Sequence, residues 1–279
     1  MGISVNRRKM TVLIKKFNAD DIKPDRIFLF VGKRGTGKST LIRDIMYRIR
    51  DKVDIPIAMT PTAESCMMFE SCMPKSCVYN EFSTGTVQAV VDEQNRLARR
   101  KQPQQHIMVV LDDMMFDKTV LKSKEVREIF MNGRHLKITF INAMQYVMDM
   151  GPDLRSQVDY VFALRDNILS NIMKLWKYFF GMFSNFQDFE RTFKSLTDNN
   201  CCIVIDNTVK SNKVEDCIFW YKADINLPPY KIGRHRYWKL DQMHGRSEDE
   251  MEDRHGRGSA GSLQHGARIH HVEMEDGVM

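Results

Sequence analysis

The sequence predicts an α/β fold, a mostly parallel β-sheet with helices on both faces. Three observations support this prediction. Runs that favour strands alternate with runs that favour helices from residue 26 onward. The strand-like runs are rich in Ile, Val and Phe and lack a polar alternation, as expected when both faces of each strand are buried. A glycine-rich loop, GKRGTGKST, joins the first of these strands to the first helix.

Bulk composition limits the possible classes of protein. The chain has 279 residues and is 43% hydrophobic, which allows one large or two small domains with a sizeable core. Its formal charge of +6 permits a polyanionic partner. The six cysteines lack zinc-type spacing and, with no signal peptide expected, predict reduced thiols in a cytosolic compartment. No run of eighteen apolar residues is present, so no membrane-spanning helix is predicted.

The expected elements follow in order along the chain. Residues 1–24 are expected to form a short N-terminal leader with one strand-like piece over 11–14. Apolar and amphipathic runs then predict strand 26–31, helix 38–50, strand 55–59, helix 62–71, strand 76–79, helix 84–101, strand 107–112, helix 122–132, strand 136–142, strand 158–164, helical material over 166–198, and strands near 202–206 and 217–221.

Two features bound the folded part of the chain. Within the last helical region, four phenylalanines recur at helical spacing and are predicted to face the core or a subunit interface: Phe183, Phe186, Phe189 and Phe193. From about Leu240 the apolar periodicity is lost, and five of the eight histidines lie in this part of the chain. Such a segment buries too little surface to offset its ordering entropy. We therefore expect a phosphate-loop ATPase domain over 25–240 and a disordered tail over 241–279.

The glycine-rich loop has the pattern G-x-x-x-x-G-K-[ST] between a strand and an amphipathic helix. Its glycines let backbone N–H groups turn toward phosphate oxygens, and the helix start adds a positive dipole end. Lys38 is expected to reach the β and γ phosphates, and Ser39 is expected to ligate Mg²⁺. The expected nucleotide-binding residues are Gly32, Lys33, Arg34, Gly35, Thr36, Gly37, Lys38, Ser39 and Thr40.

A second apolar strand, IMVVLDDMMF, ends in two carboxylates. Asp112 is expected to hold Mg²⁺, and Asp113, on the other side, is expected to polarise the water that attacks the γ phosphate. Solvated aspartates that cap a strand are the alternative. Two expected strands lie between the loop and this strand, which predicts an additional strand between them in the sheet. No N-K-x-D guanine signature is present, so ATP is the predicted nucleotide.

A third apolar strand, KITFINAMQYV, carries two amides, Asn142 and Gln145. A polar amide at the tip of a buried strand needs a partner. Beside a phosphate site that partner can be the attacking water or the γ phosphate, and we favour Gln145 for this contact. A turn residue that caps the strand is an equally compatible interpretation.

Two arginines precede expected strands, Arg134 in NGRHLK and Arg155 in DLRSQVDYVF. An arginine at such an edge can reach the γ phosphate of a neighbouring subunit and stabilise the transition state. An ordinary ion pair is the commoner role for a single arginine. Both residues are therefore catalytic candidates in trans.

Taken in order, these segments resemble the DNA-packaging ATPases of nucleocytoplasmic large DNA viruses, of the poxvirus type, within the FtsK–HerA superfamily of DNA pumps. The resemblance covers roughly residues 25–225 and is carried by FLFVGKRGTGKST, VVLDD, NGRHLKITFINAMQ, LRSQVDYVF and CCIVIDNTVKSNKVEDCIFWYKA. The first two segments are common to many ATPases, and the others are more specific. Many members carry Asp-Glu where this chain has Asp112-Asp113, so its second acid is shorter.

The resemblance implies a RecA-like fold, a homo-oligomeric ring, and hydrolysis of ATP with Mg²⁺ to translocate double-stranded DNA into a capsid. It further implies the host cytoplasm at the viral factory, or the virion, as the location. A capsid or inner-membrane vertex protein is then a possible partner. A non-viral translocase of the same superfamily is one alternative. A small-molecule kinase with the same phosphate loop is another, although no compact arginine-rich lid is present.

Two basic segments are candidate DNA contacts, RLARRK at 96–101 and YKIGRHRYWK at 230–239. The second mixes cations with aromatic side chains. Neutralisation of phosphates together with aromatic packing would suit a duplex backbone. A solvated surface is the alternative for both segments.

Overall fold

The computed structural model describes residues 3–7, 10–114, 119–147 and 150–243. The expected tail therefore lies outside the described residues, except for positions 241–243. Within the described ranges, no helix has both the length and the apolar character needed to cross a bilayer.

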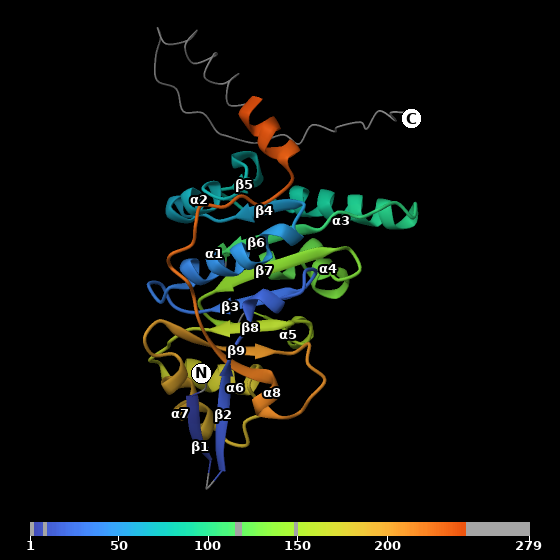
Figure 1. The fold of residues 1–279 in the computed structure, drawn as a ribbon. Helices are drawn as coiled ribbons and strands as arrows, with labels where there is room; N and C mark the ends of the chain where they lie inside the picture. Colours follow the sequence, from blue (N-terminus) through green and yellow to red (C-terminus); the bar gives the residue numbers. More distant parts are fainter. Residues whose placement is uncertain (1–2, 8–9, 115–118, 148–149, 244–279) are drawn as a thin grey trace.

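The described strands form one ten-stranded sheet in the order β1-β2-β10-β9-β8-β3-β7-β6-β4-β5 (Figure 1). Six neighbouring pairs are parallel and three, all involving β1, β9 or β10, are antiparallel. The strands are β1 Ile3–Arg7, β2 Met10–Lys16, β3 Ile27–Val31, β4 Ile55–Met59, β5 Val78–Tyr79, β6 Ile107–Asp112, β7 Ile138–Met144, β8 Tyr160–Ala163, β9 Cys201–Asp206 and β10 Ile218–Lys222. The predicted α/β class with a mostly parallel sheet is confirmed.

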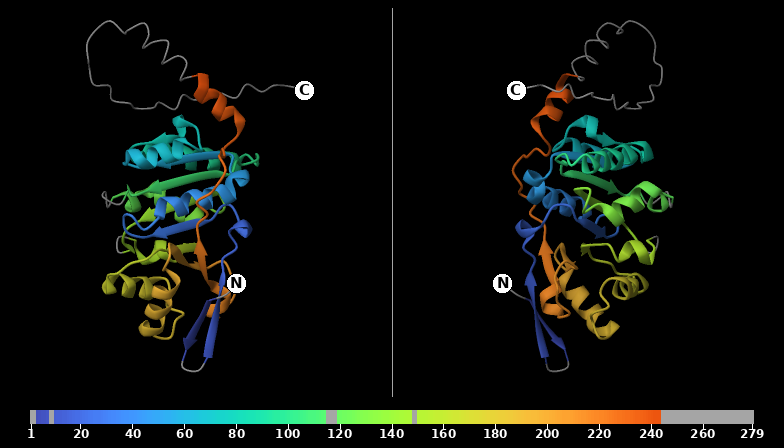
Figure 2. Two further views of the ribbon diagram at one scale, coloured as in Figure 1. Left: turned by 60° about the vertical axis from the view of Figure 1, so that its left-hand side comes forward. Right: turned by 90° about the vertical axis from the view of Figure 1, so that its right-hand side faces the viewer.

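Helices cover both sides of this sheet (Figure 2). They are α1 Lys38–Ile49, α2 Ala63–Glu70, α3 Thr84–Arg99, α4 Lys124–Asn132, α5 Pro152–Arg155, α6 Leu169–Tyr178, α7 Phe186–Leu196 and α8 Val214–Cys217, with short 3-10 turns η1 Ala19–Asp21, η2 Arg50–Lys52, η3 Lys75–Cys77 and η5 Val120–Lys122. Residues 235–243 are also helical. One buried cluster packs α1 and α2 on one face, and the other packs α3 to α7 on the opposite face.

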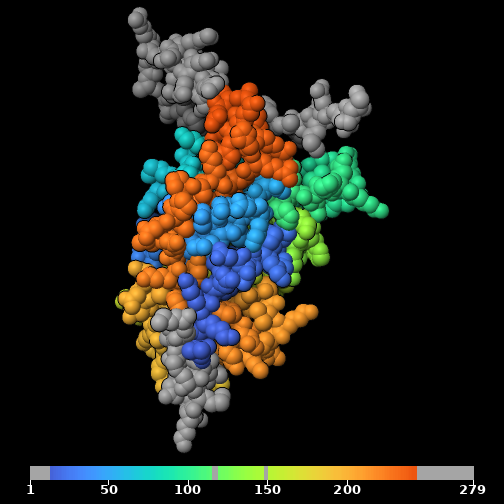
Figure 3. All heavy atoms as spheres, in the orientation of Figure 1, coloured from blue at the N-terminus to red at the C-terminus, as the bar shows by residue number. Residues whose placement is uncertain are grey.

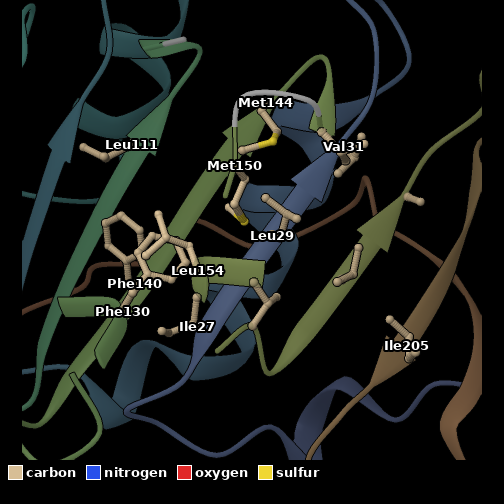
Figure 4. Packing of buried hydrophobic residues seen from close by; sticks show 14 of the residues in the cluster. Ile27, Leu29, Val31, Leu111, Phe130, Phe140, Met144, Met150, Leu154 and Ile205 are labelled. Carbon is tan, nitrogen blue, oxygen red and sulfur yellow. The ribbon is translucent and has the colours of Figure 1, made fainter. Parts of the chain in front are cut away.

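The central strands are apolar because both of their faces are covered. Along β3, Ile27, Leu29 and Val31 belong to one cluster, whereas Phe28 and Phe30 belong to the other. Figure 4 shows the first set beside side chains of β7, α4 and α5. Burial on both faces favours the unbroken apolar run seen in the sequence. This packing holds the ends of β3, β7 and β6 in fixed positions next to one another.

Two expectations about element positions need revision. Strand β7 spans 138–144 rather than 136–142, because α4 ends in a tight turn in which Lys137 adopts a φ of 55°. Within the expected leader, β2 pairs in parallel with β10 and so joins the sheet. Among the four phenylalanines at helical spacing, the prediction of a core role is confirmed: Phe183, Phe189 and Phe193 are buried, and Phe186 packs against them partly buried.

Candidate nucleotide-binding site

The carboxyl ends of β3, β7 and β6 meet at one edge of the sheet. β7 lies between β3 and β6, as the register shows: Val31 faces Met144, and Asp112 faces Ala143. The predicted additional strand between the loop and the acidic strand is therefore confirmed. In an open parallel sheet, ligands bind outside these carboxyl ends.

The phosphate loop leaves β3 at this edge and enters α1. Gly35 and Gly37 have φ values of 76° and 90°, a left-handed conformation that favours glycine. Gly32 lies close to its surroundings, since a Cβ there would be 2.7 Å from Thr36 Oγ1 and 3.0 Å from Leu164 Cβ. Thr36 Oγ1 in turn donates to the Lys33 carbonyl oxygen at 2.7 Å. The loop is thus a tight curl at the N-terminus of a helix, the geometry that suits an anion.

Lys38 lies between this loop and the acidic strand. Its side chain is buried, its Nζ donates to the Gly32 carbonyl oxygen at 3.4 Å, and it lies 3.9 Å from Asp113 Oδ1. Ser39 and Thr40 follow on the first turn of α1 and are exposed, as is Arg34 in the loop. A phosphate held by the loop would therefore meet a positioned ammonium group.

Asp112 is buried, with 2% of its surface exposed, and its two carboxylate oxygens differ in their surroundings. Ser65 Oγ donates to Oδ2 at 2.8 Å, whereas Oδ1 is buried without a hydrogen-bond partner among the described residues. Burial raises the pKa of Asp112 although Ser65 and Lys38 act to lower it. A buried carboxylate oxygen without a partner is costly, so Oδ1 is suited to a cation. Carboxylate and hydroxyl oxygens are donors that Mg²⁺ prefers, and Ser39 is exposed on the first turn of α1.

Asp113 begins the segment after β6 with a φ of 55°. Gln145, directly after β7, donates through Nε2 to Asp113 Oδ1 at 3.0 Å and Oδ2 at 3.3 Å. Two predicted catalytic residues from different strands are thus in contact beside Lys38. Asn142, the other amide of β7, is 1% exposed, and its Nδ2 is buried with no partner in the described part of the chain.

Sequence reasoning did not identify two residues that shape this site. Ser65 on α2 holds Asp112, as described above. Asp166 follows β8, lies 3.0 Å from Lys33 Nζ, and accepts from the Ile168 N–H at 2.8 Å. A serine in a helix and an aspartate in a loop are common, and neither position belongs to a recognisable motif. Their roles follow from the order of the strands, which brings α2 and the β8–α6 loop to the same edge.

The two candidate arginines do not lie at this site. Arg134 precedes β7 and therefore lies at the opposite, amino edge of the sheet, where its side chain is 59% exposed and pairs with Asp159. Asp159 also accepts from the Ile27 N–H at 2.9 Å. Burial raises the pKa of Asp159, while these partners act to lower it. Arg155 is half-buried, with its guanidinium carbon 3.8 Å from the centre of the Tyr178 ring. Of the two, Arg134 is the more accessible.

Comparison with known proteins identifies viral relatives by sequence and a solved structure of similar fold. No family model matches the chain. The chain is 30% identical over 251 residues to uncharacterized protein L437 of Acanthamoeba polyphaga mimivirus, covering 81% of this chain and 88% of that protein. It is 30% identical over 242 residues to uncharacterized protein 015R of Frog virus 3 (isolate Goorha), covering 82% and 74%.

Among solved structures, the chain resembles the crystal structure of B204, the DNA-packaging ATPase from Sulfolobus turreted icosahedral virus. The TM-score is 0.50 at 15% sequence identity, and the match covers 73% of this chain and 100% of that chain. At this level of identity the likeness concerns the fold, an α/β sheet of the phosphate-loop ATPase type.

Proposed function

Since the chain belongs to the same family as the viral proteins L437 and 015R, we propose that it is an ATP-driven translocase that packages double-stranded viral DNA into a capsid. The fold likeness to B204, itself a DNA-packaging ATPase, supports this proposal. ATP hydrolysis is proposed because Lys38 and Gln145 both lie against Asp113 beside a glycine-rich phosphate loop. The proposed setting is the host cytoplasm or the virion, with a capsid or inner-membrane vertex protein as a docking partner.

The residues of the loop would bind the triphosphate. Backbone N–H groups from Gly32 to Thr40 and the N-terminus of α1 would hold the phosphate oxygens, with Lys38 at the β and γ phosphates. Asp112 Oδ1 and the Ser39 hydroxyl would hold Mg²⁺, which when bound supplies positive charge to the phosphates. Burial of Asp112 and the hydrogen bond from Ser65 keep this carboxylate in one orientation.

Asp113 and Gln145 would act on the attacking water. Asp113 is the general base that accepts a proton from this water as its oxygen forms a bond to the γ phosphorus. Gln145 holds the Asp113 carboxylate through its amide and so limits its rotation. The bond from the γ phosphorus to the bridging oxygen breaks, which leaves ADP and phosphate. Lys38, 3.9 Å from Asp113, stabilises the negative charge that develops.

Arg134 would complete the site of a neighbouring subunit. It lies at the amino edge of the sheet, whereas the phosphate loop lies at the carboxyl edge, so one chain does not bring its own Arg134 to its own loop. A contact between the amino edge of one subunit and the carboxyl edge of the next is head-to-tail, and such contacts close into rings when the rotation allows. A homo-oligomeric ring is therefore part of this proposal.

The test is the rate of ATP hydrolysis with and without linear duplex DNA. The proposal predicts hydrolysis that duplex DNA stimulates, and Lys38→Ala, measured in parallel, should reduce the rate on the order of a hundredfold or more. A thermal melt of this variant checks that the fold is kept. Hydrolysis that DNA leaves unchanged but that a small phosphate acceptor stimulates would favour a kinase instead. Full hydrolysis by the Lys38→Ala variant would contradict the phosphate-loop assignment.

A further inference from the structure

Two basic segments that are far apart in the sequence lie at the same end of the molecule, the β4–β5 end. One is the C-terminal end of α3 with the turn after it, residues 96–101, and the other is the C-terminal segment 230–239. Figures 1 and 3 show α3 and the C-terminal helical segment at this same end. Tyr237 Oη donates to Gln105 Oε1 at 3.4 Å, which joins the second segment to the chain that leaves α3.

Asp54, just before β4, joins the C-terminal segment to the chain that leads from α3 into β6. It accepts from Arg234 Nε at 2.8 Å and from the His106 N–H at 2.8 Å. Burial acts to raise the pKa of Asp54, but the hydrogen bonds from Arg234 and His106 outweigh it and lower the pKa overall. Its carboxylate therefore stays ionised at neutral pH, and its ion pair with Arg234 holds the C-terminal segment beside the start of β4.

Both segments present exposed cations at this end of the molecule, and we call the surface that they form the α3–C-terminal basic surface. It comprises Arg99, Arg100, Lys101, Arg234, Arg236 and Lys239, all exposed. Among the described residues, no carboxylate oxygen lies within 4.0 Å of the charged nitrogens of Arg99, Arg100, Lys101 or Lys239. The nearby acidic groups have partners of their own: Glu93 pairs with Arg96, and Asp241 accepts the Lys75 and Ser76 N–H groups.

The aromatic side chains of this surface hold cations in place. The guanidinium carbon of Arg236 lies 4.8 Å from the centre of the Tyr237 ring, and Lys231 Nζ lies 4.6 Å from that of Trp238. Trp238 Nε1 donates to the Ile232 carbonyl oxygen at 2.9 Å, so the ring is fixed and half-buried. A cation already lies over each of these two rings, and cations positioned in this way suit contact with a phosphate backbone.

We propose that the α3–C-terminal basic surface binds the phosphate backbone of duplex DNA without regard to base sequence. This inference rests on the proposed function and names the part of the chain that contacts its DNA. Stabilisation of the negative end of the α3 dipole explains basic residues in its last turn, such as Arg99. It does not explain the cations of the C-terminal segment, which lie on another element.

The test measures the affinity of the full chain for a labelled linear duplex at salt concentrations from about 50 to 200 mM. Two double variants are compared, Arg99→Ala/Arg100→Ala and Arg236→Ala/Lys239→Ala. Each should weaken binding uniformly across unrelated sequences. Each should also reduce the magnitude of the slope of log affinity against log salt by about two, since each lost phosphate contact reduces that magnitude by about one. The variant that combines all four substitutions should reduce the magnitude of the slope by about four.

Lys210→Ala/Lys213→Ala is the matched control. Both lysines are exposed, and they precede β10 on the far side of β3 from β4 and β5, so this variant should keep the wild-type slope. ATP hydrolysis without DNA should be unchanged in all variants, which verifies folding. Wild-type slopes in both double variants would contradict the proposed DNA contact at this surface but leave the proposed function standing. Tighter binding to a single strand of the same length would overturn the duplex assignment. A wild-type chain that does not bind duplex DNA would contradict the proposed function as well.

Discussion

The two oxygens of the Asp112 carboxylate have different surroundings. Oδ2 accepts from Ser65 at 2.8 Å, and Oδ1 is buried with no partner in the described chain. A hydrogen bond to one oxygen fixes the rotation of the carboxylate, so the other oxygen points in a defined direction. Outer hydrogen bonds of this kind orient metal ligands and tune their affinity. Ser65 is therefore expected to matter for Mg²⁺ although it would not touch the ion.

Replacing Ser65 by Ala should raise the Mg²⁺ concentration needed for half-maximal ATP hydrolysis. A lost outer partner typically costs about 10- to 100-fold in metal affinity. The matched control is Ser71→Ala, since Ser71 is an exposed serine at the end of the same helix whose hydroxyl donates only to the Met68 carbonyl oxygen among the contacts described. The measurement is a Mg²⁺ titration of the hydrolysis rate. Equal Mg²⁺ dependence in the two variants would contradict the positioning role of Ser65.

The adjacent carboxylates should fail in different ways when each is changed to an amide. Asp113→Asn removes the proposed proton acceptor and should slow turnover by about 10²- to 10⁴-fold while ATP and Mg²⁺ still bind. Asp112→Asn removes the proposed metal ligand and should weaken Mg²⁺ binding itself. Binding of a fluorescent ATP analogue with and without Mg²⁺, measured beside the rate, separates the two effects. The same loss of Mg²⁺ affinity in both variants would show that the roles are not divided in this way.

At the scale of elements, the sequence predicts the strands and helices well because their signals are local. The buried strands β3, β4 and β6 have continuous apolar runs, and their predicted positions match the structure closely. The start of β7 was predicted two residues early, since the turn that ends α4 depends on the backbone of Lys137 rather than on hydropathy.

Contacts between elements were harder to predict than the elements. Lys38, Asp112 and Asp113 were identified because each belongs to a motif at a strand end. Ser65 was missed because it reaches Asp112 only through the position of α2 beside β6, which no local pattern states. The contact between the C-terminal segment and the chain that leaves α3 was missed for the same reason: it depends on how the chain crosses the sheet after β10.

The aromatic cluster between α6 and α7 offers a test of packing. Phe189 is fully buried, and its ring centre lies 5.0 Å from that of Phe180 and 5.4 Å from that of Phe183. Phe189→Ala should lower the free energy of unfolding by about 3 to 5 kcal/mol, because it removes buried surface and leaves a cavity. Phe186→Ala, at a partly buried position in the same helix, should cost clearly less. Urea denaturation of both variants gives the comparison, and equal losses would contradict the packing described for α7.

At the scale of the whole molecule, the proposed mechanism divides one reaction site between the two edges of the sheet. The carboxyl edge holds the phosphate loop and its carboxylates, and the amino edge presents Arg134, oriented by Asp159. Asp159 also bonds the Ile27 N–H at the start of β3, the strand that leads to the loop of the same subunit. Each subunit would thus offer an arginine to one neighbour and receive one from the other.

If Arg134 acts in trans, hydrolysis should depend on assembly, and specific activity should rise with protein concentration. Loss of an arginine of this kind lowers the rate on the order of a thousandfold or more. Inactive Lys38→Ala protein keeps Arg134, whereas Arg134→Ala protein keeps its phosphate loop. Mixing the two inactive proteins should therefore restore part of the activity, since mixed rings contain sites in which an intact loop meets an intact arginine.

The controls separate this mechanism from simple instability of the Arg134→Ala variant. Arg127→Ala removes another exposed arginine, one that pairs with the exposed Asp153, and should keep full activity alone. Arg155→Ala tests the second candidate, whose guanidinium already lies on the Tyr178 ring. A destabilised subunit would not regain activity in the presence of Lys38→Ala protein, so rescue identifies a shared site. If neither arginine variant is rescued and activity per molecule is unchanged on dilution, each chain holds a complete site, and the trans-arginine mechanism is wrong.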